Sequence, residues 1–266
     1  MGKKICICLL ILSEIIGVSC SQRSDKYVAP PTTYGALPSE RQLVWHEMEM
    51  YNMIEFSTIQ YLEEKDWGWG NEDPALVNPF KFNAEEIVLR TKAAGFKGIL
   101  VQAKHHGGFC MWPTKTTKYN ISKSPWRGGK GDWIGEWQSA CTKHGLKFGV
   151  YLSPWDRNSA IFGTPEYLEM YNAQLTELLT NYGDLFIVWF DGAPGDGGDG
   201  YYGGASEYRG GFNNYYDWDK IYEIVRKLQP NATIYHDPGP DIRWVGNEKG
   251  YAGETCWSTY IHAEQN

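Results

Sequence analysis

The sequence predicts an α/β fold of the (β/α)8-type TIM barrel class, and three observations support this. Short apolar segments alternate with amphipathic helical segments, which is typical of βα units around a parallel sheet. Helical segments end at Gly95, Gly145 and Gly183, at successive intervals of 50 and 38 residues. The length of 266 residues is close to the roughly 250 residues of a complete barrel.

Five apolar segments have the length and composition of buried parallel strands. They cover residues 52–57, 98–103, 147–153, 184–190 and 232–235, and residues 250–260 are the candidate for a sixth strand. Because eight strands are needed to close a barrel, five to six strands predict an incomplete one. No GxGxxG sequence follows the first strand and no Walker loop occurs, so the signatures of nucleotide-binding α/β folds are absent.

Four helical segments carry start and stop signals of their own. Their N-cap candidates are Asn83, Asp132, Thr164 and Asp217, and a glycine or proline follows each segment. The third segment has an apolar face at helical spacing, formed by Leu168, Tyr171, Leu175, Leu178, Leu179 and Tyr182. These helices are expected to connect the parallel strands.

The first 20 residues have the pattern of a lipoprotein-type signal peptide. Lys3 and Lys4 precede the apolar residues 5–16, and Gly17-Val18-Ser19-Cys20 resembles a bacterial lipobox whose cysteine carries lipid. Residues 21–40 contain prolines and show no periodicity, which predicts a tether, and residues 41–266 form the partial barrel domain. We therefore expect an exported periplasmic or cell-surface lipoprotein of a bacterium, attached to the membrane only through this lipid.

Charge and aromatic content narrow the class of ligand. With 25 Lys+Arg against 32 Asp+Glu the net charge is −7, which argues against a nucleic-acid binder. The 12 Trp, 18 Tyr and 10 Phe residues exceed ordinary usage, and aromatic rings suit the apolar faces of sugars, although core packing accounts for most of them. Three of the six cysteines lie beyond the expected signal peptide, namely Cys110, Cys141 and Cys256. Because three is an odd number and their spacing is not that of a metal site, buried thiols are expected rather than a set of disulfides.

Polar or aromatic residues stand at all five predicted strand ends, where a barrel carries its catalytic groups. They are Glu55; Lys104, His105 and His106; Tyr151 through Arg157; Asp191; and His236 with Asp237. Asp191 ends the most hydrophobic strand, which suits a rigidly placed nucleophile, although an Asp-Gly turn is an equally good explanation.

The adjacent His105 and His106 are more suited to hydrogen bonding with ligand hydroxyls than to a metal. Neighbouring residues on a strand point to opposite faces, and no further ligand cluster has metal-site spacing, so no metal and no cofactor is expected. Cleavage of a sugar linkage needs a second carboxyl group as proton donor. Glu248 and Glu254 are the candidates, and spacing alone does not choose between them.

An ordered set of motifs resembles the α-L-fucosidases of glycoside hydrolase family 29, most closely the subgroup associated with α-1,3/1,4-linked fucose. The motifs are RQLVW (41–45), KDWG (65–68), KHHGGFCMWP (104–113), FGVYLSPWDRN (148–158), VWFDGA (188–193) and GPDIRWVGNE (239–248). The resemblance implies a barrel that holds fucose at its strand ends, a retaining exo-hydrolase and no required metal.

The resemblance also implies roles for individual residues. Asp191 matches the nucleophile and Glu248 the acid/base. The residues that match sugar-binding positions are His105, His106, Tyr151 and Trp67, with Trp112, Trp155 and Trp189 as further wall residues. Two positions differ from the usual pattern: Glu55 stands where a sugar-binding His is common, and Gly107 where an Asp often follows the histidine pair.

The resulting hypothesis is a retaining exo-α-L-fucosidase that acts on fucosylated oligosaccharides or glycoconjugates by double displacement. Under this hypothesis, residues 41–266 form a partial catalytic domain. The alternative is a surface glycan-binding lipoprotein of the same fold with impaired catalysis, because Glu55 adds negative charge near Asp191.

Overall fold

The computed structural model describes residues 29–62, 68–191, 215–236, 239–247 and 249–256. The chain divides into two compact units, Met1–Leu37 and Pro38–Asn266, and the helices and strands of the described residues lie in the second. In chain order they are α1 (Glu40–Met48), β1 (Tyr51–Ile54), α2 (Ala84–Ala93), β2 (Gly98–Lys104), α3 (Trp133–His144), β3 (Lys147–Leu152), α4 (Pro165–Asn181), β4 (Leu185–Phe190), α5 (Trp218–Leu228) and β5 (Thr233–Tyr235). No helix within the described ranges is long and apolar enough to cross a membrane.

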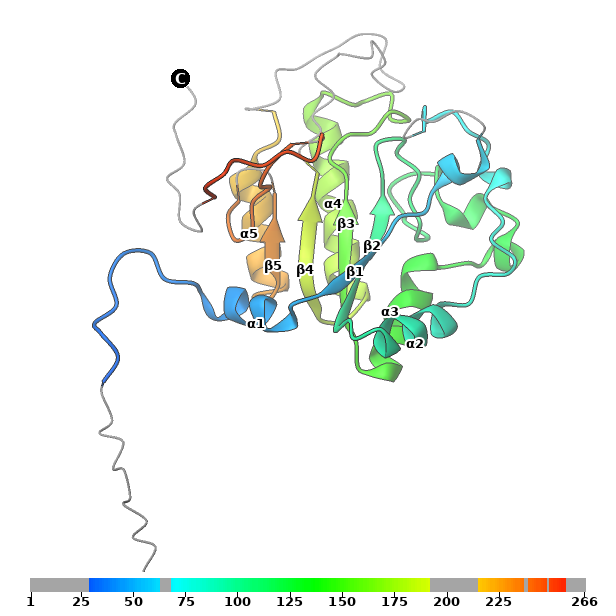
Figure 1. Ribbon diagram of the computed structural model, residues 1–266. Helices are drawn as coiled ribbons and strands as arrows, with labels where there is room; N and C mark the ends of the chain where they lie inside the picture. The colour runs from blue at the N-terminus through cyan, green and yellow to red at the C-terminus, as the bar shows by residue number, and fades with distance from the viewer. Residues whose placement is uncertain (1–28, 63–67, 192–214, 237–238, 248, 257–266) are drawn as a thin grey trace, which may run out of the picture. The chain divides into compact units, whose positions relative to one another are not determined.

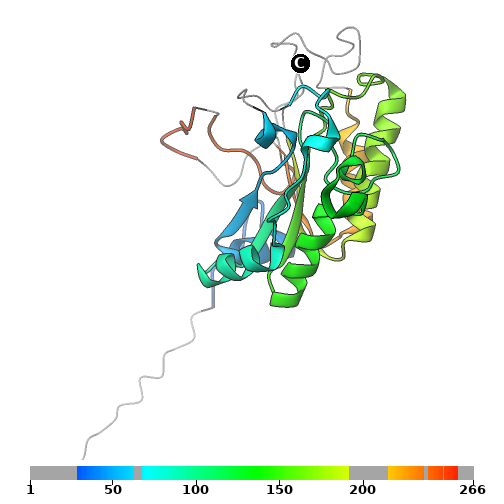
Figure 2. The ribbon, with the colours of Figure 1, turned by 90° about the vertical axis from the view of Figure 1, so that its right-hand side faces the viewer.

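The five strands form one parallel sheet in the order β1-β2-β3-β4-β5. Helices α2 to α5 cover the same face of this sheet, as Figures 1 and 2 show. Each helix connects neighbouring parallel strands, so the structure repeats the βα unit that the sequence predicts. This confirms an α/β domain of the incomplete TIM-barrel type.

The sheet separates two clusters of buried side chains because successive residues of a strand point to opposite faces. Val101, Val150 and Val188 belong to the larger cluster, which includes the helices α2 to α5. Tyr151 and Ile187 belong to a smaller cluster on the opposite face. This smaller cluster also contains Met48 of α1 together with Leu100, Phe186 and Tyr235.

All four predicted N-cap residues directly precede their helices, and three of them make a side-chain cap hydrogen bond, whereas Thr164 makes none. The side chains of Asn83, Asp132 and Asp217 accept hydrogen bonds from the backbone N–H of the third residue beyond each, at 3.2, 2.8 and 3.3 Å. Gly145 ends α3 in the left-handed conformation with φ of 71°, where a side chain would be strained. Helix α4 begins at Pro165, which needs no N–H partner at that position.

Three features differ from the sequence prediction. Strand β1 ends at Ile54 rather than at residue 57, because the Ser57 side chain accepts from the backbone N–H of Ile59 and starts a 3-10 turn. Residues 250–256 form no sixth strand, and residues 257–266 lie outside the described residues. Helix α1, which the prediction missed, begins at the end of the expected tether. The expected signal peptide at residues 1–20 lies outside the described residues as well.

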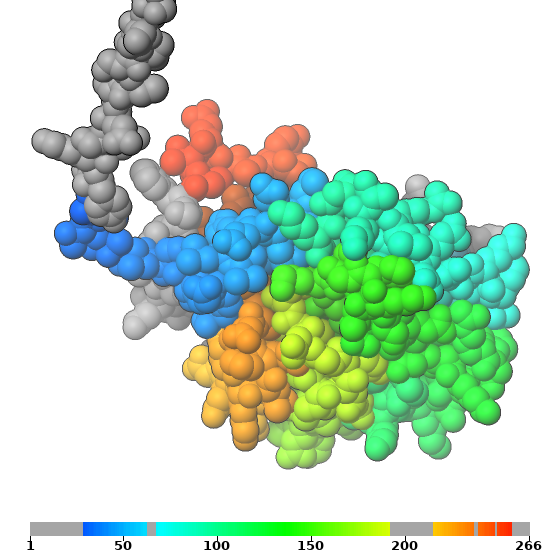
Figure 3. Space-filling view, turned by 90° about the horizontal axis from the view of Figure 1, so that it is seen from below, coloured from blue at the N-terminus to red at the C-terminus, as the bar shows by residue number. Residues whose placement is uncertain are grey.

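A buried carboxylate connects α1 to the far end of the sheet. The Asp241 side chain is 3% exposed and accepts from Arg41 Nε at 3.0 Å, from Arg226 of α5 and from the backbone N–H of Ile234 at 2.7 Å. The Gln42 amide donates to the Asp241 carbonyl at 2.8 Å. Figure 3 shows α1, in blue, side by side with the orange residues of α5. Residues 239–242 are thereby held against β5.

Asp241→Asn is expected to lower the free energy of unfolding by about 2 to 4 kcal/mol, because it leaves two cations facing an uncharged buried group. Urea unfolding measures this loss. Glu49→Gln is the matched control, since its partner Lys97 and Glu49 are both exposed, and it should change stability by no more than about 0.5 kcal/mol. Equal effects of the two substitutions would show that Asp241 does not hold these elements together.

Candidate active site at the carboxyl ends of the strands

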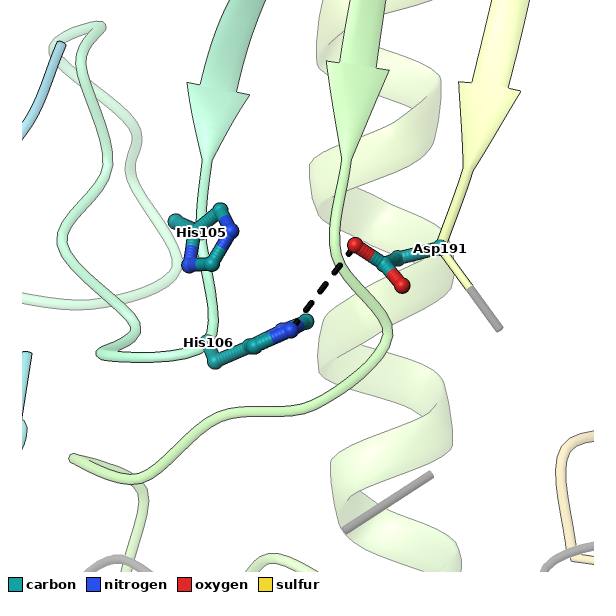
Figure 4. Close-up of side chains that lie close together, drawn as sticks. All are labelled: His105, His106 and Asp191. Carbon is teal, nitrogen blue, oxygen red and sulfur yellow. Dashed lines mark ion pairs between the residues drawn. The ribbon is translucent and has the colours of Figure 1, made fainter. Parts of the chain in front are cut away.

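Four of the sequence-predicted site residues meet at the carboxyl edge of the sheet. His105 and His106 follow β2, Tyr151 lies near the end of β3, and Asp191 directly follows β4. The Tyr151 hydroxyl donates a hydrogen bond to Asp191 Oδ2, and His106 Nε2 lies 3.7 Å from the same oxygen. Figure 4 shows the two imidazole rings and the carboxylate around one space.

Strand register explains why Tyr151 and Asp191 meet. Tyr151 lies opposite Trp189 in the β3–β4 pair. Asp191 follows Trp189 by two residues and therefore points to the same face of the sheet. The side chain of Asp191 is 15% exposed, so it is open to a ligand while its position is set by the rigid end of β4.

The expectation that His105 and His106 point to opposite faces is wrong. The strand ends at Lys104 and the chain turns, with the Gly108 N–H donating to the His105 carbonyl at 2.9 Å. The two rings therefore lie only 4.1 Å apart between centroids. His106 Nδ1 pairs with Ser153 Oγ at 2.7 Å, and this contact leaves Nε2 as the ring atom nearest Asp191.

The protonation states follow from burial and neighbouring charge. Burial, and then the positive charges of Arg157 and Lys104, lower the pKa of His106 to about 3, so the ring is neutral at physiological pH. Burial, followed by the charge and the hydrogen bond of Asp191, raises the pKa of Tyr151 well above its usual value. Tyr151 thus keeps its proton and donates a hydrogen bond to the Asp191 carboxylate.

A buried ion pair lies directly beneath the histidine turn. Lys104 is fully buried and its Nζ lies 3.4 Å from Asp156 Oδ2, with Tyr167 Oη at 3.2 Å and Gln174 Oε1 at 3.0 Å. A side chain at Gly108 would meet Asp156 Oδ1 at 2.1 Å, so only glycine fits there. The two strand-end loops are therefore locked to each other and to α4.

Arg157 fixes a third loop at this edge. Its guanidinium donates to the Gly68 carbonyl at 2.9 Å and lies 5.0 and 4.4 Å from the ring centroids of Trp69 and Trp155. The backbone N–H of Arg157 donates to the His106 carbonyl at 2.8 Å. Sequence reasoning missed the supporting roles of Lys104, Asp156 and Arg157, although charged residues within apolar strand-end segments were a usable signal.

Aromatic rings form a continuous row from β2 to β5. His105 stacks on Tyr151 at 5.6 Å, Tyr151 on Trp189 at 4.9 Å, and Trp189 on Tyr235 at 4.3 Å. Tyr235 was not among the predicted site residues. The row lies on the face of the sheet that carries Asp191, so it provides stacked aromatic surface next to the carboxylate.

The remaining predicted residues have different placements. Glu55 is exposed just beyond β1, and its charge contributes to the raised pKa of Tyr151, which places it in electrostatic reach of the site. The Trp155 ring is buried 5.1 Å from the His106 ring. Glu254 is exposed. Trp67 and Glu248 lie outside the described residues.

Trp112 requires a correction. Its side chain is 1% exposed in the larger core cluster, and its indole N–H donates to Glu177 of α4 at 2.8 Å. The tryptophan thus packs between the sheet and the helix layer, with no ring face open to a sugar. Since the chain has left β2 at this point, strand alternation no longer decides the direction of the side chain.

Comparison with known proteins shows the family to which the chain is similar. The family model Alpha-L-fucosidase matches residues 32–255. Alpha-L-fucosidase 1 of Arabidopsis thaliana is 39% identical over 249 residues, covering 93% of this chain and 46% of the relative.

Two solved structures are similar to the chain. A glycoside hydrolase 29 family member from an unknown rumen bacterium has a TM-score of 0.80 and 50% identity, covering 87% of this chain and 42% of that one. A mutant Ruminococcus gnavus GH29 fucosidase in complex with fucose has a TM-score of 0.69 and 29% identity, covering 87% and 49%. The chain spans less than half the length of each of these relatives. Because the family model matches far more than half of the chain, the protein belongs to the alpha-L-fucosidase family, glycoside hydrolase family 29.

Proposed function

We propose that this chain carries the active site of an α-L-fucosidase that removes terminal α-L-fucose from glycans. The observation that carries the proposal is Asp191 at the carboxyl edge of the sheet, in hydrogen-bond contact with Tyr151 and beside neutral His106. A related fucosidase from Ruminococcus gnavus has been solved in complex with fucose, which supports the same sugar as the ligand here.

The proposed mechanism is a double displacement with retention of configuration. The Asp191 carboxylate attacks the anomeric carbon while the bond to the glycosidic oxygen breaks, and the Glu248 carboxyl gives that oxygen its proton. Glu248 then takes a proton from water, whose oxygen attacks the anomeric carbon and releases Asp191. The partial exposure of Asp191 and its fixed position at the end of β4 support its role as nucleophile.

The surrounding side chains fit a neutral sugar. In the proposal, His105 and His106 hydrogen-bond its hydroxyls, because a neutral imidazole has one donor and one acceptor nitrogen. Trp189, which is partly exposed beside Asp191, offers an apolar surface to the ring and methyl group of fucose, and the buried Tyr151 ring stacks against it. Glu55 accepts from a further hydroxyl, and Trp67 and Trp155 complete the site.

The proposed substrates are fucosylated oligosaccharides or glycoconjugates, with α-1,3 or α-1,4 linkage as the expected preference. An exported lipoprotein would meet them outside the cytoplasm, and the signal-like residues 1–20 support that location. A glycan-binding lipoprotein of the same fold is the second candidate, favoured by the negative charge of Glu55 near Tyr151 and Asp191.

Asp191→Asn is expected to lower kcat on an aryl α-L-fucoside at least about 1,000-fold, because an amide oxygen cannot replace the carboxylate nucleophile. Release of the aryl group and of free fucose measures the effect. Retention of wild-type turnover by this variant would disprove the nucleophile assignment. If the wild-type chain binds fucosylated oligosaccharides and releases no fucose on long incubation, the glycan-binding function is correct instead.

Glu248→Gln and Glu254→Gln should separate the two candidates for the acid/base. Loss of a general acid slows poor leaving groups most, so the Glu248 variant should lose about 100-fold in kcat/KM on the phenyl fucoside and much less on the dinitrophenyl fucoside. Glu254→Gln, at an exposed position, should change kcat/KM on each of the two substrates by less than about twofold. The reverse pattern would assign the role to Glu254.

The free energy of unfolding of His106→Asn is expected to fall less on acidification than that of the wild type. A histidine in the unfolded chain titrates near 6.5 and folded His106 near 3, so below pH 6.5 the unfolded state binds a proton that the folded state does not. Between pH 7 and pH 5 the wild type should therefore lose about 2 kcal/mol more unfolding free energy than the variant. Urea unfolding at both pH values measures this difference. His46→Asn at an exposed helix position is the matched control, and equal losses in wild type and His106→Asn would contradict the neutral buried ring.

A further inference from the structure

We propose that His105, His106 and Asp191 bind a divalent transition-metal ion such as Zn²⁺, and that the bound ion blocks the sugar site. The metal in this proposal is an inhibitor and takes no part in hydrolysis. The proposal goes beyond the proposed function, because binding of the ion does not depend on whether the chain cleaves fucosides.

The distances among the three groups are close to those of a metal site. Each residue offers one ligand atom, and these atoms all lie within 4.8 Å of one another. The separation of His106 Nε2 from Asp191 Oδ2 is 3.7 Å. Bonds of about 2.0 to 2.1 Å in a tetrahedron place ligand atoms about 3.3 Å apart. This pair therefore needs to close by only a few tenths of an ångström, and His105 can follow by rotation because it is only partly buried.

The donor set selects the type of ion. Two imidazole nitrogens and one carboxylate oxygen suit Zn²⁺ or Cu²⁺, whereas Mg²⁺ and Ca²⁺ prefer oxygen ligands only. The partial exposure of His105 and Asp191 leaves room for water as a fourth ligand. Three protein ligands with water in the fourth position is one of the arrangements in which proteins bind zinc.

The neighbouring contacts already orient the ligands. Ser153 Oγ lies 2.7 Å from His106 Nδ1, and metal-bound histidines commonly make this second contact through the ring nitrogen that does not bind the metal. The Tyr151 hydroxyl holds the Asp191 carboxylate in the same way. Two of the three ligands are thus held in place before the ion arrives, which reduces the entropy lost on binding.

The surrounding charges set a moderate affinity. Lys104 and Arg157 oppose a cation, but Lys104 is paired with Asp156 and Arg157 lies between two tryptophan rings. Glu55 is exposed and adds negative charge within electrostatic reach of the site. Affinity in the micromolar range is expected, which is sufficient for inhibition by added zinc.

Isothermal titration of the wild-type chain with ZnCl₂, in a buffer that does not bind zinc, tests the proposal. One zinc ion per chain is expected. His105→Gln and Asp191→Asn should each weaken binding at least tenfold, with folding checked by circular dichroism. The matched control is His144→Gln, because His144 with Glu85 and Lys143 is a second histidine–carboxylate group on the surface. It should leave zinc affinity unchanged.

Competition with L-fucose tests the overlap of the two sites. Saturating L-fucose should weaken the apparent zinc affinity at least fivefold, and MgCl₂ titrated in place of zinc should give no binding. Zinc binding that survives in both site variants, that is lost in His144→Gln, or that is indifferent to fucose overturns the proposal. The titration measures zinc binding and needs no substrate turnover. The aryl fucoside assay therefore tests the proposed hydrolysis independently of the zinc proposal.

Discussion

The candidate site depends on the parallel pairing of β2, β3 and β4. Backbone hydrogen bonds place Gln102 opposite Tyr151 and Tyr151 opposite Trp189, and the same register carries Asp191 to the face that Tyr151 occupies. A shift of one residue would turn Asp191 toward the helices and break its contact with the Tyr151 hydroxyl. The direction of all five strands also brings every βα loop to one edge, which is why groups far apart in sequence share one space.

Buried charges beneath this edge hold the loops that carry the site. Lys104 and Asp156 pair under the histidine turn, and Arg157 fixes the Gly68 loop between two tryptophan rings. Because these charges are buried away from water, removing the partner of any one of them would cost desolvation free energy that nothing offsets. Burial, together with the positive charges of Arg157 and Lys104, keeps His106 neutral beside the partly exposed Asp191 carboxylate, the nucleophile in the proposed mechanism.

Much of the fold could be predicted because its signals are local. A cap such as Asp132 accepts from Gly135 only three residues away, and an apolar strand is recognised from its own few residues. Helix α1 was missed even though Ser39 and Gln42 form a capping box at its start. The contact that holds α1 against the sheet joins Arg41 to Asp241, which are 200 residues apart in the chain, so it cannot be read from the local sequence.

The sequence by itself determined the order of strands and helices, their caps and the position of Asp191 at a strand end, because backbone hydrogen bonding and side-chain alternation act over a few residues. Only the tertiary structure decided the direction of side chains beyond the strand ends. His105 and His106 come together because the chain turns and Ser153 holds one ring, and Trp112 packs in the core because Glu177 accepts its N–H. These partners lie on other elements of the fold, so no local pattern could specify them.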